Sequence, residues 1–299
     1  MTTHTVSLLI NPVAGRGRAG RRLRRIRELI EAAGIAIEVH ESRSLGDLEA
    51  QAAELTRNEA SRLIVAGGDG SIHEVVNGIM TAGGGSALGV IPTGTGNDFA
   101  KAAQIPLDWE AATRLLALRI KDDAPPRSID VGRMNRRYFA NGAGIGLDAK
   151  VTRIARSYDW PVGDLVYLAA IFRAMVDGIA TPEITIHSDE LQWQGPLTLV
   201  NISNGPWIGG MFYIAPMAIN DDGALELVIA GPVTRRRILQ LLPKLMRGQH
   251  MNEPDISHAS VRRVSITASE PVPSHLDGEV QPLQSSFEFE ILPSALNLL

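Results

Sequence analysis

One stretch decides the fold class of this 299-residue chain: Leu63-Ile64-Val65-Ala66-Gly67-Gly68-Asp69-Gly70-Ser71. The four apolar residues predict a short buried strand, and the glycines after it predict a tight loop that leads into a helix over 71–82. Segments 11–17 and 92–98 repeat this arrangement, because each is glycine-rich and follows an apolar run, at 6–10 and 88–91. Three such strand-to-loop units are typical of an open parallel sheet.

The rest of the first 120 residues keeps the same alternation of short apolar runs and longer amphipathic segments. Expected strands cover 6–10, 35–40, 63–66 and 88–91, and expected helices cover 20–33, 46–60 and 71–82. This order predicts a doubly wound parallel α/β domain. The pattern changes near Pro125-Pro126, which we interpret as a linker that ends this domain at residue 126.

Residues 127–291 follow a different pattern and predict a second domain of mainly antiparallel strands. Its apolar runs are short, are separated by turn residues, and lie at 129–134, 137–141, 183–187, 197–202, 225–229, 260–267 and 286–291. Helices are expected near 147–155, 163–178 and 234–247.

Composition excludes several classes of protein. Lys and Arg number 29 and Asp and Glu number 33, so a net charge of −4 gives no overall attraction to nucleic acid or anionic membrane. An apolar fraction of 44% excludes a mainly disordered chain, and zero cysteines exclude disulfides, thiolate nucleophiles and thiolate-bound zinc. The sequence shows no convincing signal peptide or membrane span, so we expect a cytoplasmic protein.

The three glycine-rich segments predict a phosphate-binding site. Parallel strands end at one edge of a sheet, where glycines let backbone amides approach a phosphate and helix N-termini favour anions. A single glycine loop is more often an ordinary turn, but three at one edge favour the binding site. Asp69 adds a carboxylate that can hold Mg²⁺; alternatively it caps the helix that begins near Ser71, and both roles are compatible.

A competing interpretation starts from Gly15, Gly17 and Gly20, which satisfy the G-x-G-x-x-G pattern of dinucleotide-binding oxidoreductases. Glu38 or Glu41 lies about 20 residues further on, as that pattern requires. Asn11-Pro12 ahead of the glycines and the crowding of arginines around them make this alternative weaker.

The motifs taken together resemble one family. They are Asn11-Pro12-x-x-Gly15, Gly67-Gly68-Asp69-Gly70-Ser71-Ile72-His73-Glu74, Pro92-Thr93-Gly94-Thr95-Gly96-Asn97-Asp98-Phe99-Ala100, Asn204-Gly205, Gly209-Gly210, Ala215-Pro216, Asp221-Asp222-Gly223 and Leu276-Asp277-Gly278-Glu279. In this order they are similar to the diacylglycerol kinase catalytic family, especially its bacterial soluble lipid kinases, over residues 9 to about 292. Ser71 stands where the family usually has Thr, and Ala14 where Ser is common.

The resemblance implies an N-terminal ATP-binding α/β domain that the chain rejoins at about 292–299, and a C-terminal antiparallel β-sandwich that holds a lipid. It also implies ATP and Mg²⁺ as cofactors. By motif, the ATP contacts fall on Asn11, Ser42, Gly67, Gly68, Asp69, Gly70, Ser71, Ile72, His73, Gly94, Thr95 and Asn97. Mg²⁺ falls on Asp222 with the carbonyls of Ile219 and Ala224, and the proton acceptor on Glu279 with Asp277 beside it.

The residues around Glu279 and Asp222 also have a plain structural interpretation. Asp277 and Glu279 flank a glycine, so in an extended strand their carboxylates would share one face and supply a general base. Alternatively, Asp277-Gly278 is a hairpin turn, and Asp221-Asp222-Gly223 an ordinary turn. The residues alone favour the turns, whereas the resemblance favours the catalytic and metal-binding roles.

Two further segments leave alternatives open. Segment 16–27 carries seven arginines on a predicted helix. The basic face of this helix is either exposed to solvent or a contact for anionic lipid headgroups. Nucleic acid is the least favoured of the three alternatives. A second set of residues lines an acyl-chain groove or, more often for such spacings, packs in the core: Tyr158, Trp160, Tyr167, Phe172, Met175, Trp207, Met211 and Phe212. The histidines show no metal-ligand spacing, and His73 is expected to be a polar surface residue.

These observations predict a lipid kinase that phosphorylates a hydroxyl of diacylglycerol or a related lipid presented by a membrane. The alternatives are an NAD kinase, which shares the Gly-Gly-Asp-Gly loop, and a nucleotide-binding regulator without catalysis. We expect Asp69→Ala and Glu279→Gln each to lower turnover at least about 100-fold while leaving the fold intact. The sequence does not determine the headgroup or the oligomeric state, and a homodimer stays open.

Overall fold

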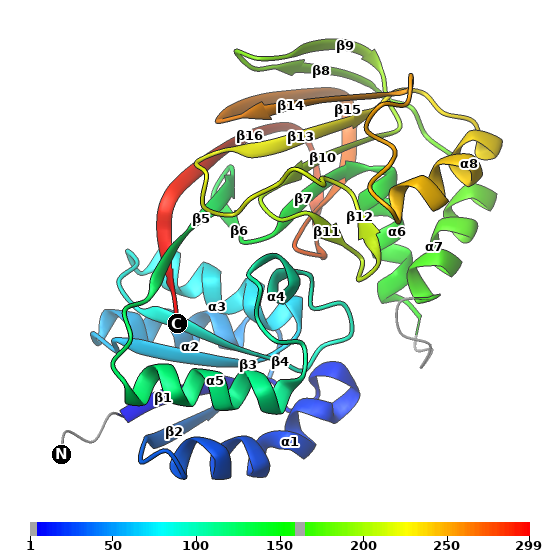
Figure 1. The fold of residues 1–299 in the computed structure, drawn as a ribbon. Helices are drawn as coiled ribbons and strands as arrows, with labels where there is room; N and C mark the ends of the chain where they lie inside the picture. Colours follow the sequence, from blue (N-terminus) through cyan, green and yellow to red (C-terminus); the bar gives the residue numbers. More distant parts are fainter. Residues whose placement is uncertain (1–4, 159–164) are drawn as a thin grey trace. The chain divides into compact units, whose positions relative to one another are not determined.

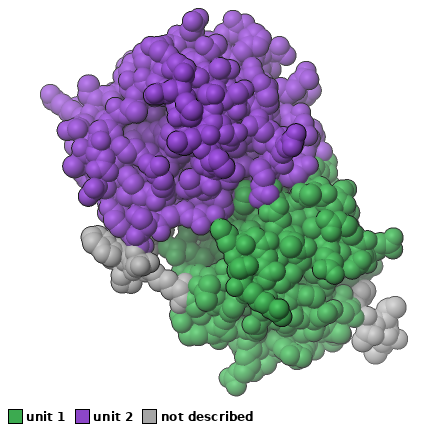
Figure 2. Space-filling view, turned by 180° about the vertical axis from the view of Figure 1, so that it is seen from behind, with its two compact units in different colours: residues 1–130, 294–299 green, residues 131–293 purple. Residues whose placement is uncertain are grey.

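The computed structural model describes residues 5–158 and 165–299, and the chain divides into two compact units (Figures 1 and 2). Unit 1 runs to Asp130 and takes up the chain again from Ser294 to Leu299, and unit 2 covers Val131–Pro293. No helix in the described residues is both long and apolar enough to cross a bilayer.

Unit 1 contains the parallel sheet that the sequence predicts. Its strands are β1 (Thr5–Ile10), β2 (Ala36–Glu41), β3 (Arg62–Gly67) and β4 (Ala87–Pro92), in the order β2-β1-β3-β4, and every neighbouring pair is parallel. The end of β16 adds a further parallel partner to β4 through Asn297 and Leu298. The predicted doubly wound α/β arrangement is confirmed.

Helices cover both faces of this sheet. They are α1 (Ala14–Glu31), α2 (Asp47–Arg57), α3 (Asp69–Thr81), the short α4 (Asp98–Ala102) and α5 (Trp109–Lys121). Helices α1 and α5 lie on one face and α2 and α3 on the other (Figure 1). The face toward α1 and α5 buries Val6, Leu8 and Ile10 of β1 against Ile26 and Ile30 of α1, as the alternation along a strand requires.

Unit 2 is built from antiparallel strands. They are β5 (Arg127–Met134) and β6 (Arg137–Phe139), then β7 (Gly142–Gly146), β8 (Glu183–His187), β9 (Gln192–Pro196), β10 (Leu199–Ser203), β11 (Trp207–Ile208), β12 (Phe212–Tyr213), β13 (Leu225–Ala230), β14 (Ile256–Val261), β15 (Arg263–Leu276) and β16 (Glu279–Leu298). The main order is β14-β13-β10-β7-β15-β16, with β8 and β9 joined to the first half of β15. Strands β5 and β16 also carry the chain between the units.

The long strand β15 links two layers of unit 2. Its first half pairs with β8 through residues 265–268 and its last three residues pair with β7, and pairing with β16 is irregular between these parts. The inner faces form one apolar core that includes Ile145, Ile186, Val200, Leu227 and Phe287. This arrangement is the predicted β-sandwich.

Three helices cover the outer face of the β7-β10-β13 layer: α6 (Leu147–Arg156), α7 (Leu165–Val176) and α8 (Arg235–Leu245). They form a second apolar cluster with residues such as Val151, Ile171, Phe212 and Leu242. Unit 2 therefore has apolar packing on both faces of this layer.

Candidate active site

The three glycine-rich segments of unit 1 meet at one edge of its sheet. In register, Ile10 of β1 lies beside Glu41 of β2 and Ala66 of β3, and Gly67 lies beside Pro92 of β4. The strands are parallel and end at the same level, so the loops that follow β1, β3 and β4 lie together, as the sequence predicts.

Backbone contacts hold the loops in place. The N–H of Thr93 donates to the carbonyl of Gly67 at 2.9 Å. A Cβ added to Gly94 would lie 2.5 Å from the Cα of Gly68, and one added to Gly15, at φ +58°, would lie 2.6 Å from the carbonyl oxygen of Thr93. Only glycine allows the loops to approach this closely, because any side chain would meet backbone.

Arg18 connects the first and third loops. Its Nε donates to the carbonyl of Gly15 at 2.9 Å, and its Nη2 donates to Oγ1 of Thr95 at 2.8 Å. A guanidinium has five N–H donors, so donors are left over for a phosphate at this edge. Among the described residues, no carboxylate lies within ion-pair distance of Arg18.

Asp69 is the first residue of α3, which begins directly after Gly68. Its Oδ1 accepts the N–H of Phe99, in the first turn of α4, at 3.0 Å. The alternative in which Asp69 caps a helix that begins near Ser71 places the helix start two residues too late, because α3 begins at Asp69. Asp69 ties the second loop to the start of a helix thirty residues away.

The start of α3 offers backbone N–H groups to an anion. The N–H of Ile72 already donates to Gly68 at 3.1 Å, whereas the N–H groups of residues 69–71 precede the first helical bond. The side chains of Ser71, Ile72 and His73 are buried. His73 is only 2% exposed, so the expected polar surface position is wrong. Residues 72 and 73 thus pack at the helix start, and the amides of 69–71 are the N–H groups that this helix start could offer to an anion.

The other predicted contacts in unit 1 also lie at this edge. Asn11 follows β1 and accepts the N–H of Val13 through Oδ1 at 3.1 Å. Ser42 follows β2, and its N–H donates to Ile10 at 2.8 Å. Asn97, at φ +50°, precedes α4 and donates through Nδ2 to Gly94 at 3.3 Å, while its buried Oδ1 has no hydrogen-bond partner. Asn11, Ser42 and Asn97 thus lie at the same edge of the sheet as the glycine-rich loops.

In unit 2, Asp277 and Gly278 form the two-residue turn between β15 and β16. Their φ angles are +49° and +85°, and Leu276 pairs with Glu279 across the turn. Of the two alternatives left open for this segment, the extended strand with two carboxylates on one face is therefore wrong. The alternative hairpin turn is correct, because Asp-Gly suits a turn with two positive φ angles.

The Asp277 carboxylate has a positioning role in this turn. It accepts three backbone N–H groups, from Ala140 at 3.0 Å, Asn141 at 2.8 Å and Gly142 at 3.0 Å. These bonds fasten the turn to the segment that leads into β7. A carboxylate committed to three donors is a poor candidate for a general base.

Glu279 is paired with Arg156, the last residue of α6. Nη1 of Arg156 forms an ion pair with Oε2 of Glu279 and donates to the carbonyl of Gly278 at 3.0 Å. Because one guanidinium holds both the carboxylate and the turn, the orientation of Glu279 depends on α6.

The predicted Mg²⁺ ligands lie in a turn ahead of β13. Oδ1 of Asp222 accepts the N–H of Ala224 at 3.0 Å, and the side chains of Ile219 and Asp222 are exposed. One carboxylate and two carbonyl oxygens are hard donors that suit Mg²⁺, which keeps several waters. Among residues 5–158 and 165–299, no cluster of three or more His, Asp or Glu side chains is arranged for a metal.

Glu226 on β13 lies near this turn and is buried. Burial raises the pKa of its carboxyl above the ordinary value, and the charge of Asp222 raises it further, while a hydrogen bond from Ser260 and the charge of His258 oppose the shift. Glu226 is therefore less readily ionised than an exposed glutamate.

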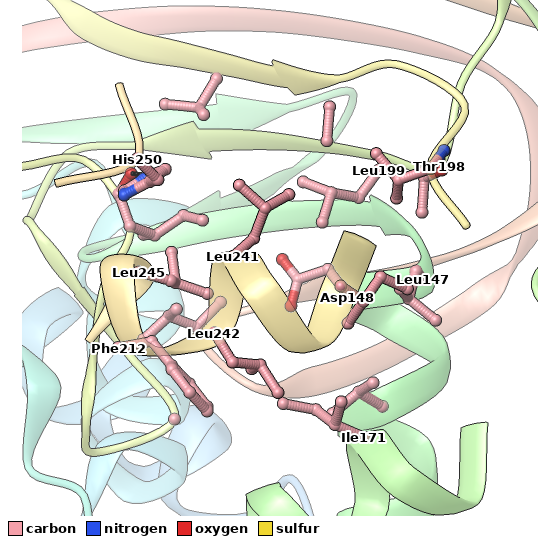
Figure 3. A pocket seen from close by; sticks show the side chains of 18 of the residues that line it. Leu147, Asp148, Ile171, Thr198, Leu199, Phe212, Leu241, Leu242, Leu245 and His250 are labelled. Atoms are coloured by element: carbon pink, nitrogen blue, oxygen red, sulfur yellow. Dashed lines mark hydrogen bonds between the residues drawn. The ribbon is translucent and has the colours of Figure 1, made fainter. Parts of the chain in front are cut away.

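Unit 2 also contains an apolar pocket beneath α8, with a cavity volume of about 120 Å³ (Figure 3). Leucines 241, 242 and 245 of α8 line it together with Ile171 of α7 and Phe212 of β12. Polar groups enter it from Asp148, Thr198 and His250. A pocket of this composition fits hydrocarbon.

The structure divides the aromatic residues that the sequence analysis grouped as a groove. Tyr167 and Phe212 line the pocket, Met175 packs in the adjoining core, and Phe172 is exposed. Trp207 stacks on Tyr213 with ring centroids 4.4 Å apart. Trp160 lies outside the described residues.

Comparisons with known proteins agree with this geometry. Residues 5–134 match the diacylglycerol kinase catalytic domain, and residues 142–299 match the YegS C-terminal NAD kinase beta sandwich-like domain. The diacylglycerol kinase of Bacillus subtilis (strain 168) is 31% identical over 280 residues, which cover 91% of this chain and 88% of the relative. The chain belongs to the diacylglycerol kinase family.

Other relatives place this chain in the same family. The diacylglycerol kinase of Staphylococcus epidermidis (strain RP62A) is 30% identical, with 91% of this chain and 84% of the relative covered. A solved structure from Bacillus anthracis (strain Sterne), described as a diacylglycerol kinase, has a TM-score of 0.81 at 26% identity. The match covers 100% of this chain and 97% of the solved chain. The protein is a lipid kinase, a phosphotransferase, and kinase membership implies ATP as phosphoryl donor.

Family membership also decides against the oxidoreductase alternative. Helix α1 begins at Ala14, so Gly15, Gly17 and Gly20 lie inside this helix. A Cβ added to Gly20 would lie 2.8 Å from the carbonyl oxygen of Pro12, which gives this glycine a packing reason.

Two functional candidates were missed in the sequence. Arg18 appeared there only as one of the arginines of segment 16–27, and Arg156 lay just past the end of the helix expected near 147–155. Their partners, Thr95 and Glu279, lie 77 and 123 residues away, so no local pattern identifies them.

Proposed function

We propose that this lipid kinase transfers the γ-phosphoryl group of ATP, with Mg²⁺, to a hydroxyl of diacylglycerol or a related lipid. The observation that carries the choice of a lipid acceptor is the apolar pocket under α8, since its lining suits acyl chains and offers little to a polar nucleotide. The 31% identity to the Bacillus subtilis diacylglycerol kinase supports the same acceptor class.

The proposed nucleotide site lies at the loop edge of unit 1. The N–H groups of residues 69–71 would hold phosphate oxygens at the positive end of α3, and Arg18 would add charge from the first turns of α1. The loops are held by their own backbone contacts before any ligand binds, which keeps these donors in place.

The residues present fit Mg²⁺ in chemical type. Asp222 and the carbonyls of Ile219 and Ala224 would hold an ion in unit 2, and, taken by itself, the carboxylate of Asp69 is a hard oxygen donor in unit 1 that could hold Mg²⁺ there. When bound, Mg²⁺ offsets the negative charge of the transferring phosphoryl group.

Glu279 is the proposed proton acceptor. As the lipid hydroxyl oxygen forms its bond to the γ-phosphorus, the bond from that phosphorus to the bridging oxygen breaks and ADP leaves with its electron pair. The hydroxyl proton passes to the Glu279 carboxylate, which Arg156 holds in one orientation. No residue needs to be phosphorylated.

The lipid substrate would be presented by a membrane surface, with α1 as one peripheral contact. The structure limits the positive face of α1, because Arg24, Arg25 and Arg27 lie within ion-pair distance of glutamates and Arg22 lies over the ring of Trp109 at 5.0 Å. Binding to anionic vesicles should therefore be weak and should fall as salt rises. Vesicle binding that is independent of salt would contradict this contact.

The second candidate acceptor is NAD, because residues 142–299 match an NAD kinase beta sandwich-like domain. The deciding experiment incubates the purified protein with γ-labelled ATP, Mg²⁺, detergent-dispersed lipids and NAD. We expect label in the organic phase on diacylglycerol or a related lipid, and loss of that label, by at least about 100-fold, in Glu279→Gln. Label on NAD would establish the alternative, and ATP binding without transfer would indicate a regulator.

A further inference from the structure

A buried histidine contacts the turn that carries Glu279. His275, on β15, is 1% exposed, and its Nδ1 accepts the N–H of Gly278 at 3.3 Å. Its Nε2 lies 3.2 Å from Oδ2 of Asp148, near the start of α6. An Nδ1 that accepts carries no proton, so the bond from Gly278 selects the tautomer with its proton on Nε2, the ring nitrogen that lies beside the carboxylate, although Nε2 and Oδ2 do not meet hydrogen-bond geometry.

The ring is enclosed by neighbours that fix its place. Gly144 of β7 pairs with His275, and a Cβ there would lie 2.1 Å from Oδ2 of Asp148 and 2.5 Å from Nε2 of His275. On the next strand, Asn201 pairs with Gly144 and donates to Oδ2 of Asp148 at 3.4 Å, and Ser203 donates to Oδ1 of Asn201 at 2.5 Å. A buried polar network of this kind keeps its members in one arrangement.

Helix α6 holds the turn from two points. Asp148, in its first turn, faces His275, which accepts from Gly278, and Arg156, its last residue, binds Gly278 and Glu279 directly. Asp148 also lines the apolar pocket beside Leu147 and Val151. The same helix therefore contacts both the pocket and the turn.

We infer that His275, held by Asp148, is a positioning residue that sets the Asp277-Gly278 turn and so the orientation of Glu279. This inference rests on the proposed role of Glu279 as proton acceptor. His275 touches neither substrate nor the reacting atoms in this arrangement, and it acts through the backbone of Gly278.

Two substitutions separate the contacts of the ring. His275→Asn keeps an acceptor near the position of Nδ1, whereas His275→Gln keeps a donor near the position of Nε2 and loses that acceptor. We expect His275→Gln to lower kcat at least about tenfold with KM values for ATP and lipid within about twofold, and His275→Asn to restore kcat to within about threefold of the wild type. Equal losses in both variants, or changes confined to KM, would overturn the inference.

Hydrogen exchange of residues 276–280 tests the placement without catalysis. Faster exchange in His275→Gln than in His275→Asn, with the rest of unit 2 unchanged, supports the inference even if no lipid is phosphorylated. Faster exchange together with no phosphorylated lipid would support the inference about His275 and contradict the proposed function. Unchanged exchange in both variants overturns the inference. His258→Gln, at an exposed histidine of β14, is the matched control and should leave this segment unaffected.

Asp148→Asn covers the case in which neither His275 variant folds. It removes only the charge that faces Nε2, so it should raise exchange in 276–280 and lower kcat, each less than His275→Gln does. Wild-type exchange and wild-type kcat in Asp148→Asn would overturn the role of the pair.

Discussion

The carboxylate of Asp69 accepts a structural hydrogen bond, and its negative charge has a proposed role in catalysis. Two substitutions separate these two roles. Asp69→Asn keeps an oxygen that can accept the N–H of Phe99, whereas Asp69→Ala removes it. We expect both variants to lower kcat at least about 100-fold, and the alanine variant alone to lose about 1 kcal/mol in the free energy of unfolding. Steady-state kinetics and urea unfolding measure the two effects.

This expectation revises the one drawn from the sequence, in which Asp69→Ala left the fold intact. The bond from Phe99 gives the side chain a part in holding α4, so an alanine there leaves an N–H without its acceptor. Near-normal kcat in Asp69→Asn would remove the charge of Asp69 from the mechanism.

His250 gives unit 2 a predictable dependence on pH. Burial lowers the pKa of His250, the charge of His258 lowers it further, and a bond to the carbonyl of Ile214 opposes the shift. In the unfolded chain the pKa returns to about 6.5, so the unfolded state alone takes up a proton as pH falls through that value. His250 therefore favours folding above about pH 6.5, and this contribution is lost progressively below it.

The test compares the wild type with His250→Gln, which keeps a donor toward Ile214 and does not titrate. We expect the unfolding temperature of the wild type to fall, relative to that of the variant, between pH 7.5 and 5.5. Because the other titrating groups are shared, the difference isolates His250. A gap that stays constant across this range would show that His250 does not titrate differently in the two states.

At the scale of elements, α1 combines two kinds of arginine. Arg18 reaches two loops at the edge of the sheet, whereas Arg24 has a side chain that is 92% exposed and pairs with Glu28 on its own helix. We expect Arg18→Ala to raise the Kd for ATP at least about tenfold, and Arg24→Ala to change it less than twofold. Isothermal titration calorimetry with ATP measures both.

The comparison within one helix controls for the loss of positive charge. If both variants weaken the binding of ATP equally, α1 acts on the nucleotide through its total charge, and the specific contact of Arg18 is not needed. If Arg18→Ala binds ATP as the wild type does, the guanidinium serves only to hold the loops.

At the scale of the whole molecule, the two units have separate cores and separate candidate sites. The loops at 67–71 belong to unit 1, and the pocket formed by α7 and α8 belongs to unit 2. We expect a nonhydrolysable ATP analogue to slow hydrogen exchange in 67–71, and a short-chain diacylglycerol to slow it in α7 and α8. Mass spectrometry with each ligand alone measures the two patterns. Protection of α8 by the nucleotide as strong as that of 67–71 would contradict this division.

Much of unit 1 could be predicted from the sequence because its signals are local. A run such as Leu63–Ala66 buries a strand, and the glycines after it end the strand and begin α3 within a few residues. Helix α5 was not predicted, although Ala112, Leu116 and Ile120 recur at helical spacing.

Unit 2 was harder to predict from the sequence at positions where tertiary packing overrides the strand propensity of the residues. Strand β7 has the sequence Gly-Ala-Gly-Ile-Gly, which has low strand propensity, and it forms because Gly144 leaves room for Asp148 and His275 and pairs with both neighbouring strands. The burial of His73 is of the same kind, since no local pattern distinguishes a buried histidine from an exposed one.

The sequence by itself determined the two-domain class, the glycine loops and the family, since these depend on residue types at fixed spacings along the chain. Only the tertiary structure decided that Asp69 binds Phe99, that Asp277 fastens a turn, and that Arg156 pairs with Glu279. The physical reason is that these contacts join residues 30 to 136 positions apart, and their geometry is set by the packing of whole elements.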